Sequence, residues 1–286
     1  MKTVHILKIE LWKSIINWGF VFSVLITFCL LFTTQVYTDI LDGKTYNVIQ
    51  AYRLLRQDVV YSTPEFASIL ILQKTLSSYF VMFIPIIAAF PFIPNFCAER
   101  NSGLIRYAIS RTGKLQYYIT KFLSAIFSGG FSVLLGYLLF FFVIAVTFPS
   151  IADYNLPKEL LSLYIGSNTL VTIAMAVAGV FLYGSVSTIP AFLLAAFVRN
   201  RYIITCVPFM ITYLYSSSLT KLIYDSVLKQ NQKQINFYTM LKPESISCLY
   251  RQDNISRNSM LIFLYFGVAC FLLFVLIMNR RHDYGE

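Results

Sequence analysis

Six long stretches of the chain contain no charged residue, and their length predicts its architecture. About 20 apolar residues in a helix cross a hydrocarbon core of roughly 30 Å. One charge at the centre of such a helix would cost about 3 kcal/mol, so the absence of charge is the decisive feature. The pattern predicts an all-α membrane protein with six transmembrane helices in one transmembrane domain, residues 1–286. The expected spans are residues 15–37, 75–97, 122–148, 169–198, 202–219 and 259–279.

The charge-free stretch Leu160–Val198 is too long for one straight crossing. As a single helix it would reach about 58 Å. We interpret it as an interfacial piece near Leu160–Asn168 followed by one long, bent span with Pro190 as a possible break. A division into two spans would place Arg199 and Arg201 outside, against the rule that cytoplasmic loops are rich in Lys and Arg.

The segments flanking the first two spans carry helical patterns of their own. In residues 1–15 an apolar stripe (Val4, Leu7 and Leu11) predicts a short helix in the cytoplasmic interface, although an extension of the first span fits equally well. Apolar residues at helical spacing between Asp39 and Lys74 predict a helix on the outer leaflet (Val48, Tyr52, Leu55 and Val59). Thr63 and Pro64 then predict the start of the helix that becomes the second span. Three prolines predict that this span is kinked (Pro85, Pro91 and Pro94).

The charged residues predict the topology. The chain carries 23 Lys and Arg against 13 Asp and Glu. The N-terminus, Glu99–Lys121, Arg199–Arg201 and the tail after Arg280 hold 12 of these bases and four of the acids in short segments. This denser positive side is expected to be cytoplasmic, with both termini, in a multi-pass protein of the cell membrane. The bases are too dispersed among apolar stretches to form a nucleic-acid surface.

The spans lack the side chains that membrane chemistry requires. They contain no Asp, Glu, His, Lys or Arg, and the five cysteines show no paired spacing, so we predict no enzyme, no metal site and no bound cofactor. The pair Gly113-Lys114 is followed by Leu115, not Ser or Thr, so it is no phosphate-binding loop. The polar residues of the spans could line a path, but hydrogen bonds between helices explain them more simply. They are Asn17, Thr27, Ser132, Ser167, Asn168, Thr172, Ser185, Ser187 and Thr188.

The segment Glu99–Lys114, between the second and third spans, has an ordered pattern. A short helix over Ser102–Ile109 would be bounded by Gly103 near its start and Gly113 after its end. It would present Leu104, Ile105 and Ala108 on one face, with Arg106 at its flank. Such an element can insert into a groove on a soluble partner.

Here the sequence resembles the permease subunits of type-2 ABC transporters. The shared features are Glu99-Arg100, Ser102-Gly103, the short helix and Gly113-Lys114, although Thr112 replaces a common proline. The stretches Gly184-Ser185, Leu193–Tyr202 and Pro208-Phe209 are similar to the fourth and fifth spans of firmicute-like members. Leu241-Lys242-Pro243 is similar to the element before the last span. The likeness runs in order through most of the chain.

The resemblance implies an ATP-driven exporter in which two permease chains face each other above two separate ABC ATPase subunits. ATP and Mg²⁺ would bind the partner, and the substrate would be a peptide, a drug or another amphipathic molecule. The short helix would be a coupling helix, and its contact residues would be Glu99, Arg100, Ser102, Gly103, Leu104, Ile105, Arg106, Tyr107, Arg111 and Lys114. We also expect a second cytoplasmic contact at Arg199, Asn200 and Arg201. The alternative is a six-span scaffold or sensor without transport, and an adjacent reading frame for an ATPase would favour the transporter.

Overall fold

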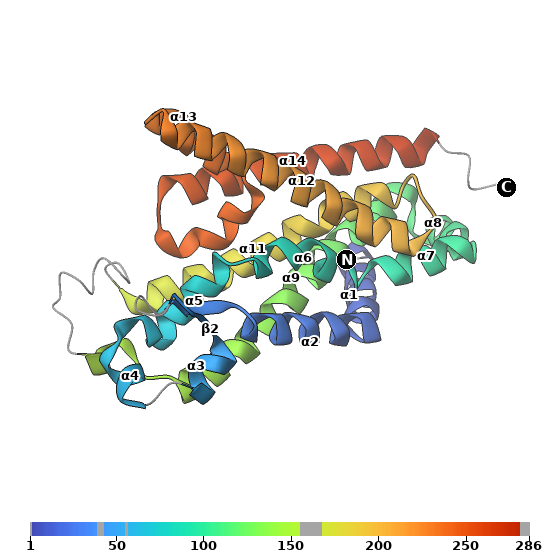
Figure 1. The fold of residues 1–286 in the computed structure, drawn as a ribbon. Helices are drawn as coiled ribbons and strands as arrows, with labels where there is room; N and C mark the ends of the chain where they lie inside the picture. Colours follow the sequence, from blue (N-terminus) through green and yellow to red (C-terminus); the bar gives the residue numbers. More distant parts are fainter. Residues whose placement is uncertain (1, 39–42, 55–56, 155–167, 281–286) are drawn as a thin grey trace.

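The computed structural model describes residues 2–38, 43–54, 57–154 and 168–280, and long helices that run back and forth dominate it (Figure 1). Five helical segments are long and apolar enough to cross a membrane, or six if the bent pair at the N-terminus counts as one span. The all-α membrane architecture predicted from the sequence is therefore confirmed. The elements that build the spans are α1 (Lys2–Ile15), α2 (Trp18–Phe32), α6 (Phe80–Ala89), α7 (Ile93–Asn101), α9 (Lys114–Thr147), α11 (Thr169–Leu194), α12 (Arg201–Leu228) and α14 (Asn254–Arg280).

The predicted first span is divided. Helices α1 and α2 meet at 59°, so the N-terminal helix is not a straight extension of the next one. Asn17, at the break, donates from its side chain to the Pro91 carbonyl (3.3 Å). The span was expected to reach residue 37, but α2 ends at Phe32 and Gln35–Thr38 forms strand β1, which pairs antiparallel with β2 (Thr45–Asn47). The sequence analysis did not anticipate this hairpin.

The next segment, expected to lie outside the membrane, forms several short helices. They are α3 (Val48–Leu54), α4 (Gln57–Ser62), the 3₁₀ turn η1 (Pro64–Phe66) and α5 (Ser68–Leu76). Thr63 is the N-cap of η1 and Pro64 is at its start, as predicted, but the helix does not run on into the span. Instead, α5 is largely buried and ends before the span begins at Phe80. Residue 75, the predicted start of the span, therefore lies in α5 and not in the long helical segment that follows.

The proline-rich span is bent at the predicted residues. Pro85 lies inside α6, Pro91 lies between α6 and α7, and Pro94 is in the first turn of α7. A proline inside a helix cannot donate the bond to the carbonyl four residues earlier, which bends the helix. In the described part of the stretch Leu160–Val198, from Asn168 onward, there is one long helix, α11, which starts after the N-cap Asn168. The proposed interfacial piece near Leu160–Asn168 falls almost entirely outside the described residues.

Helices α9 and α11 cross at glycines. A Cβ atom on Gly130 would lie 2.2 Å from the Ser185 Oγ, and one on Gly129 would lie 2.1 Å from the Thr188 Cγ2, both on α11. Small residues at such a crossing let helix backbones approach closely in lipid. Only some of the polar residues of the spans make the hydrogen bonds between helices that the simpler interpretation predicts. Ser23 on α2 bonds Ser132 on α9 (2.8 Å), whereas Thr27 and Thr188 bond carbonyls of their own helices.

The segment after α12 returns into the bundle. Helix α12 continues to Leu228, α13 covers Gln232–Leu241, and the 3₁₀ segment η3 covers Pro243–Arg251. In η3, Ile246 and Ser247 are fully buried, and Ser247 donates to the Leu76 carbonyl (3.1 Å). The segment therefore covers one end of the bundle.

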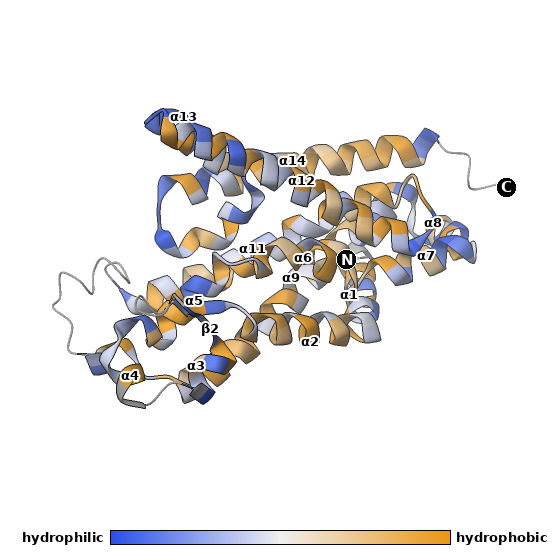
Figure 2. Ribbon diagram, viewed as in Figure 1, coloured by the Kyte–Doolittle hydropathy of each residue, from blue (hydrophilic) through white to orange (hydrophobic). Residues whose placement is uncertain are grey.

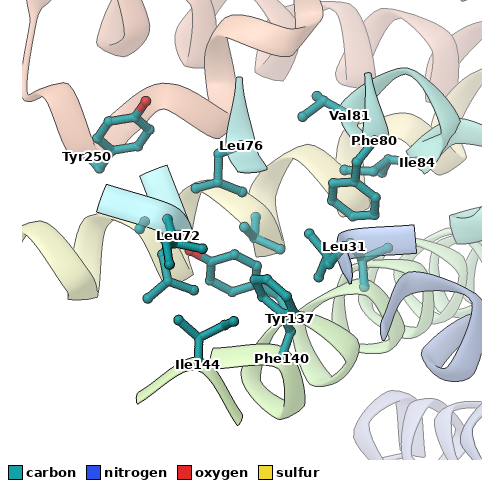
Figure 3. Close-up of a cluster of buried hydrophobic side chains, with 14 of the residues drawn as sticks. Leu31, Leu72, Leu76, Phe80, Val81, Ile84, Tyr137, Phe140, Ile144 and Tyr250 are labelled. Carbon is teal, nitrogen blue, oxygen red and sulfur yellow. The ribbon is translucent and has the colours of Figure 1, made fainter. Parts of the chain in front are cut away.

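Two clusters of buried apolar side chains occupy the two halves of the bundle. The cluster at one end joins α2, α5, α6, α9 and η3, and Figure 3 shows Leu31, Leu72, Phe80, Tyr137 and Tyr250 among its members. The second cluster joins α7, the helix α8 (Leu104–Thr112) and the ends of α11 and α14. We call the end that holds α8 the basic end, because Arg100, Arg199 and Arg201 meet beside α7 there and the end of α14, which carries Arg280, packs in the same cluster as α8.

Candidate functional site

The predicted short helix is present as α8 (Leu104–Thr112), two residues later at its start and three at its end than expected. Gly103 precedes it with φ +71° and Gly113 follows it with φ +87°. Residues that have a Cβ atom rarely adopt a positive φ, so glycine at both positions lets the chain turn sharply into and out of the helix. The polar colour of this region contrasts with the apolar helices behind it (Figure 2). The role of α8 in coupling stays a prediction.

Helix α8 has one face in the core and one face exposed. Ile105 and Ile109 are 6% and 9% exposed and belong to the same buried cluster as Phe96, Tyr118 and Phe274. Leu104 and Tyr107, in contrast, are 55% and 73% exposed. The expectation that Leu104 and Ile105 share one face is therefore wrong. Adjacent residues are about 100° apart on a helix of 3.6 residues per turn, and here the core lies on the Ile105 side.

The exposed face of α8 carries both apolar and basic side chains. Leu104, Tyr107 and Arg111 follow at i, i+3 and i+7, which places them on one stripe of the helix. All three are exposed, as are Arg106 on α8 and Lys114 at the start of α9. We call Leu104, Tyr107 and Arg111 the α8 outer stripe. It combines large apolar contact area with positive charge, a composition found at the centres of protein interfaces.

Behind α8, a cluster of charges joins three helices. Lys121 on α9 is 3% exposed and forms ion pairs with Glu10 on α1 and Glu99 on α7. Lys13 lies 3.6 Å from Glu10 and 3.7 Å from Glu99, at the exposed side of the cluster. A buried cation is tolerated only when it is paired, so Lys121 requires both carboxylates in place. Glu99, predicted as a coupling residue, therefore fixes the base of α7 to α1 and α9.

Arg100 and the second predicted contact meet at the other side of α7. The Arg100 guanidinium donates to the Ala195 and Val198 carbonyls, at the end of α11. Positive charge at a helix C-terminus is favourable because the last carbonyls lack partners within the helix. Asn200 caps α12 by accepting from the Tyr202 amide (3.0 Å), and the Arg201 guanidinium lies over the Tyr202 ring. These contacts stabilise the α11–α12 turn.

The structure thus brings Glu99–Asn101 and Arg199–Arg201 together, although about 100 residues separate them in the sequence. A cavity of about 380 Å³ lies between them, lined by Cys97, Ala98 and Asn101 on one side and by Arg199, Asn200 and Arg201 on the other. Ser102 and Gly103 form the turn from α7 into α8, and the Ser102 hydroxyl donates to the Glu99 carbonyl (3.2 Å). These two residues shape the turn; the outer stripe lies beyond them.

The sequence analysis missed the charge cluster. Lys121 was assigned only to the end of a loop, and Glu10 and Lys13 to an interfacial helix. One signal was available: Glu10 is the only acid among the first 38 residues, in a segment otherwise rich in Lys. An isolated acid in a basic segment needs a partner, yet the sequence separation of 111 residues hides which base that is.

The described residues offer no centre for metal chemistry. They contain no group of three His, Cys, Asp or Glu side chains close enough to hold a metal ion. All five cysteines are free; Cys97 and Cys270 are buried, whereas Cys29 and Cys206 are exposed on their helices. The polar features at the basic end are therefore structural ion pairs, helix caps and the outer stripe of α8.

Comparison with known proteins assigns no family. No protein-family model matches the sequence, and a search of curated proteins finds no significant relative. The function must therefore be argued from the residues and their arrangement.

Proposed function

We propose that this chain is the membrane subunit of an ATP-driven exporter of the type-2 ABC class, and that α8 docks on a separate ATPase subunit. Two permease chains and two ATPase subunits would form the complex in the cell membrane, with both termini in the cytoplasm. ATP and Mg²⁺ would bind the ATPase. The observation that carries the proposal is α8 itself, a short helix anchored on one face and exposed on the other.

The arrangement of the helices supports this topology. The segments expected in the cytoplasm, Glu99–Lys121, Arg199–Arg201 and the end of α14, all lie at the basic end (Figure 1). Helix α9 has 34 residues and would reach about 51 Å, well beyond a hydrocarbon core of roughly 30 Å. Its first turns, including Lys121, can therefore lie in the headgroup region, where charge is tolerated.

The anchoring of α8 is suited to the transmission of motion. A partner can shift a conformational equilibrium only through contacts that differ between the two states, so the contact must be firmly linked to the helices that move. Ile105 and Ile109 link α8 to the cluster that contains Phe192 on α11 and Phe274 on α14. Glu99 and Lys121 link the preceding and following helices. A displacement of the α8 outer stripe would therefore reach four membrane helices.

The test is co-purification in mild detergent from the source cells. Wild-type chain should bring with it a polypeptide that carries a phosphate-binding loop and hydrolyses ATP. Leu104→Asp places a charge in the contact and should remove most of the bound ATPase, since loss of one buried apolar anchor commonly costs about 2 kcal/mol or more. Ile105→Asp is a poor test because it would damage the core of the chain itself.

The matched control is Gln50→Asp, on α3 at the opposite end of the bundle, where the side chain is exposed. It should leave the ATPase bound. Full ATPase retention by Leu104→Asp would contradict docking through α8. A wild-type chain that purifies alone, with no ATP hydrolysis, would instead favour the scaffold or sensor, the alternative that the sequence leaves open.

A further inference from the structure

An apolar cavity of about 520 Å³ lies on the lipid side of the bundle and takes no part in the site described above. Helices α11, α12 and α14 form most of its walls; Pro85 of α6, Leu241 at the end of α13 and Pro243 at the start of η3 also line it. Its volume is within the range of about 300–1,000 Å³ that is typical of ligand pockets.

Prolines shape this cavity. Pro85, Pro190 and Pro208 lie inside three different helices, α6, α11 and α12, and all three line its wall. A proline bends its helix because it lacks the N–H and crowds the preceding turn. Three such residues around one space keep the helices apart there. In contrast, the glycine crossing of α9 and α11 brings the backbones together.

The wall excludes charged ligands. Among the residues that line the cavity none is charged, and most are aliphatic or aromatic. Two of its hydroxyls are already engaged: Thr212 donates to the Pro208 carbonyl (2.9 Å) and Tyr215 to the Leu241 carbonyl (3.2 Å). A peptide, nucleotide or ion would lose hydration without gaining compensating bonds, at a cost of several kcal/mol. The occupant must be apolar where it touches the wall.

The dimensions indicate an extended chain. On α11 the lining residues run from Tyr183 to Leu194, which is about 16 Å along the helix. One leaflet of a bilayer core, half of roughly 30 Å, has similar thickness. Ile211 on α12 and Phe266 on α14, both exposed in the chain, border the cavity and open it toward the surrounding lipid. Acyl chains are the apolar molecules present there.

We infer that this cavity binds a single acyl chain, from a bilayer phospholipid or from a free fatty acid. An acyl chain that enters the cavity from the bilayer leaves lipid and not water, so it gains only the closer packing. The site should therefore select chains by shape and fill from the membrane. The inference does not depend on the proposed function, because binding needs neither an ATPase nor a second chain.

The experiment uses the purified full-length chain in phosphatidylcholine nanodiscs with a palmitic acid that carries a diazirine within its chain. After irradiation, peptide mass spectrometry should locate adducts on cavity residues such as Leu194 and Phe263, at least five times as often as on lipid-facing Leu272 and Leu276. Excess unlabelled palmitate or phosphatidylcholine with matching chains should reduce these adducts. The competitor that reduces them more shows whether the bound acyl chain comes from a free fatty acid or from a phospholipid. Equal labelling of cavity and lipid-facing residues would overturn the inference.

A matched pair of variants on α12 provides the control. Ile211 lines the cavity and is 60% exposed, whereas its neighbour Met210 does not line it and is 59% exposed. Ile211→Trp should fill the space and reduce cavity adducts about tenfold; Met210→Trp should leave them within about twofold of wild type. Unchanged labelling in a folded Ile211→Trp chain would contradict the inference. If that variant fails to fold, the smaller Ile211→Phe and the wild-type adduct map still decide the question.

Discussion

Both ends of the helical bundle hold a cluster of buried apolar side chains, but the basic end also holds a buried cluster of charges. There, Lys121 is buried between two carboxylates and Arg100 caps the end of α11. At the opposite end, Tyr250 of η3 packs among the apolar side chains (Figure 3), and Ile246 of η3 is fully buried. Buried ion pairs fix geometry more than they add stability. The comparison indicates that ion pairs fix the geometry of the basic end, whereas η3 covers the opposite end.

The largest effect is expected at the charge cluster. Lys121→Met would leave Glu10 and Glu99 facing each other without their cation, which should cost about 3–5 kcal/mol. Thermal unfolding in detergent, followed by size-exclusion chromatography, measures the loss. Lys13→Met is the control: Lys13 is 55% exposed and contacts the same two carboxylates, so its loss should cost less than about 1 kcal/mol. Lys121→Met combined with Glu10→Gln and Glu99→Gln should recover much of the stability. Equal unfolding temperatures for the two lysine variants would refute the structural role of the cluster.

At the opposite end, removal of apolar volume should matter most. Ile246→Ala in η3 leaves a cavity beneath α11, and such changes typically cost about 2–5 kcal/mol. Ile49→Ala, at an exposed position of α3, should stay within about 0.5 kcal/mol of wild type. The same detergent assay compares them. Similar small losses for both residues would mean that η3 does not belong to the packed core.

The smallest effect is a change in thiol reactivity at the same end. Burial raises the pKa of the Cys248 thiol above its ordinary value, and nearby Arg251 offsets this only in part. Because the thiolate is disfavoured in the folded chain, stability from this group is present below its ordinary pKa and is lost as pH rises through the raised value. In a chain whose other cysteines are replaced, maleimide should label Cys248 slowly at pH 8 and faster only at higher pH. The control is a chain in which Cys248 is also replaced and Lys233→Cys places the single cysteine at an exposed position. Its labelling rate should change with pH as that of an ordinary thiol does. The same pH dependence for Cys248 and for this control would contradict the burial of Cys248.

The sequence predicted the structure well where contact with lipid determines it. Charge-free stretches located the membrane helices because an uncompensated charge cannot lie in hydrocarbon, and Pro85, Pro91 and Pro94 marked the bends. Gly103 and Gly113 bounded α8 because only glycine readily takes their positive φ.

The sequence predicted the structure poorly where segments that are far apart along the chain come into contact. The hairpin of β1 and β2, the buried helix α5 and the return of η3 all depend on tertiary contacts that local patterns do not encode. For α8, the pattern of Leu104 and Ile105 identified apolar residues but could not tell which would face the chain's own core. The pairing of Lys121 with Glu10 spans 111 residues, and no local spacing predicts it.

The central claim, that the α8 outer stripe contacts an ATPase subunit, is tested most directly by photocrosslinking. Tyr107 and Tyr52 are matched sites: each is a tyrosine on a short helix, 73% and 64% exposed, at opposite ends of the bundle. A photoreactive phenylalanine analogue replaces one or the other, and cells are irradiated before membranes are solubilised. We predict that position 107 crosslinks to a polypeptide with a phosphate-binding loop and that position 52 does not. Absence of that product at position 107, in a chain that still assembles in the membrane, would contradict the account.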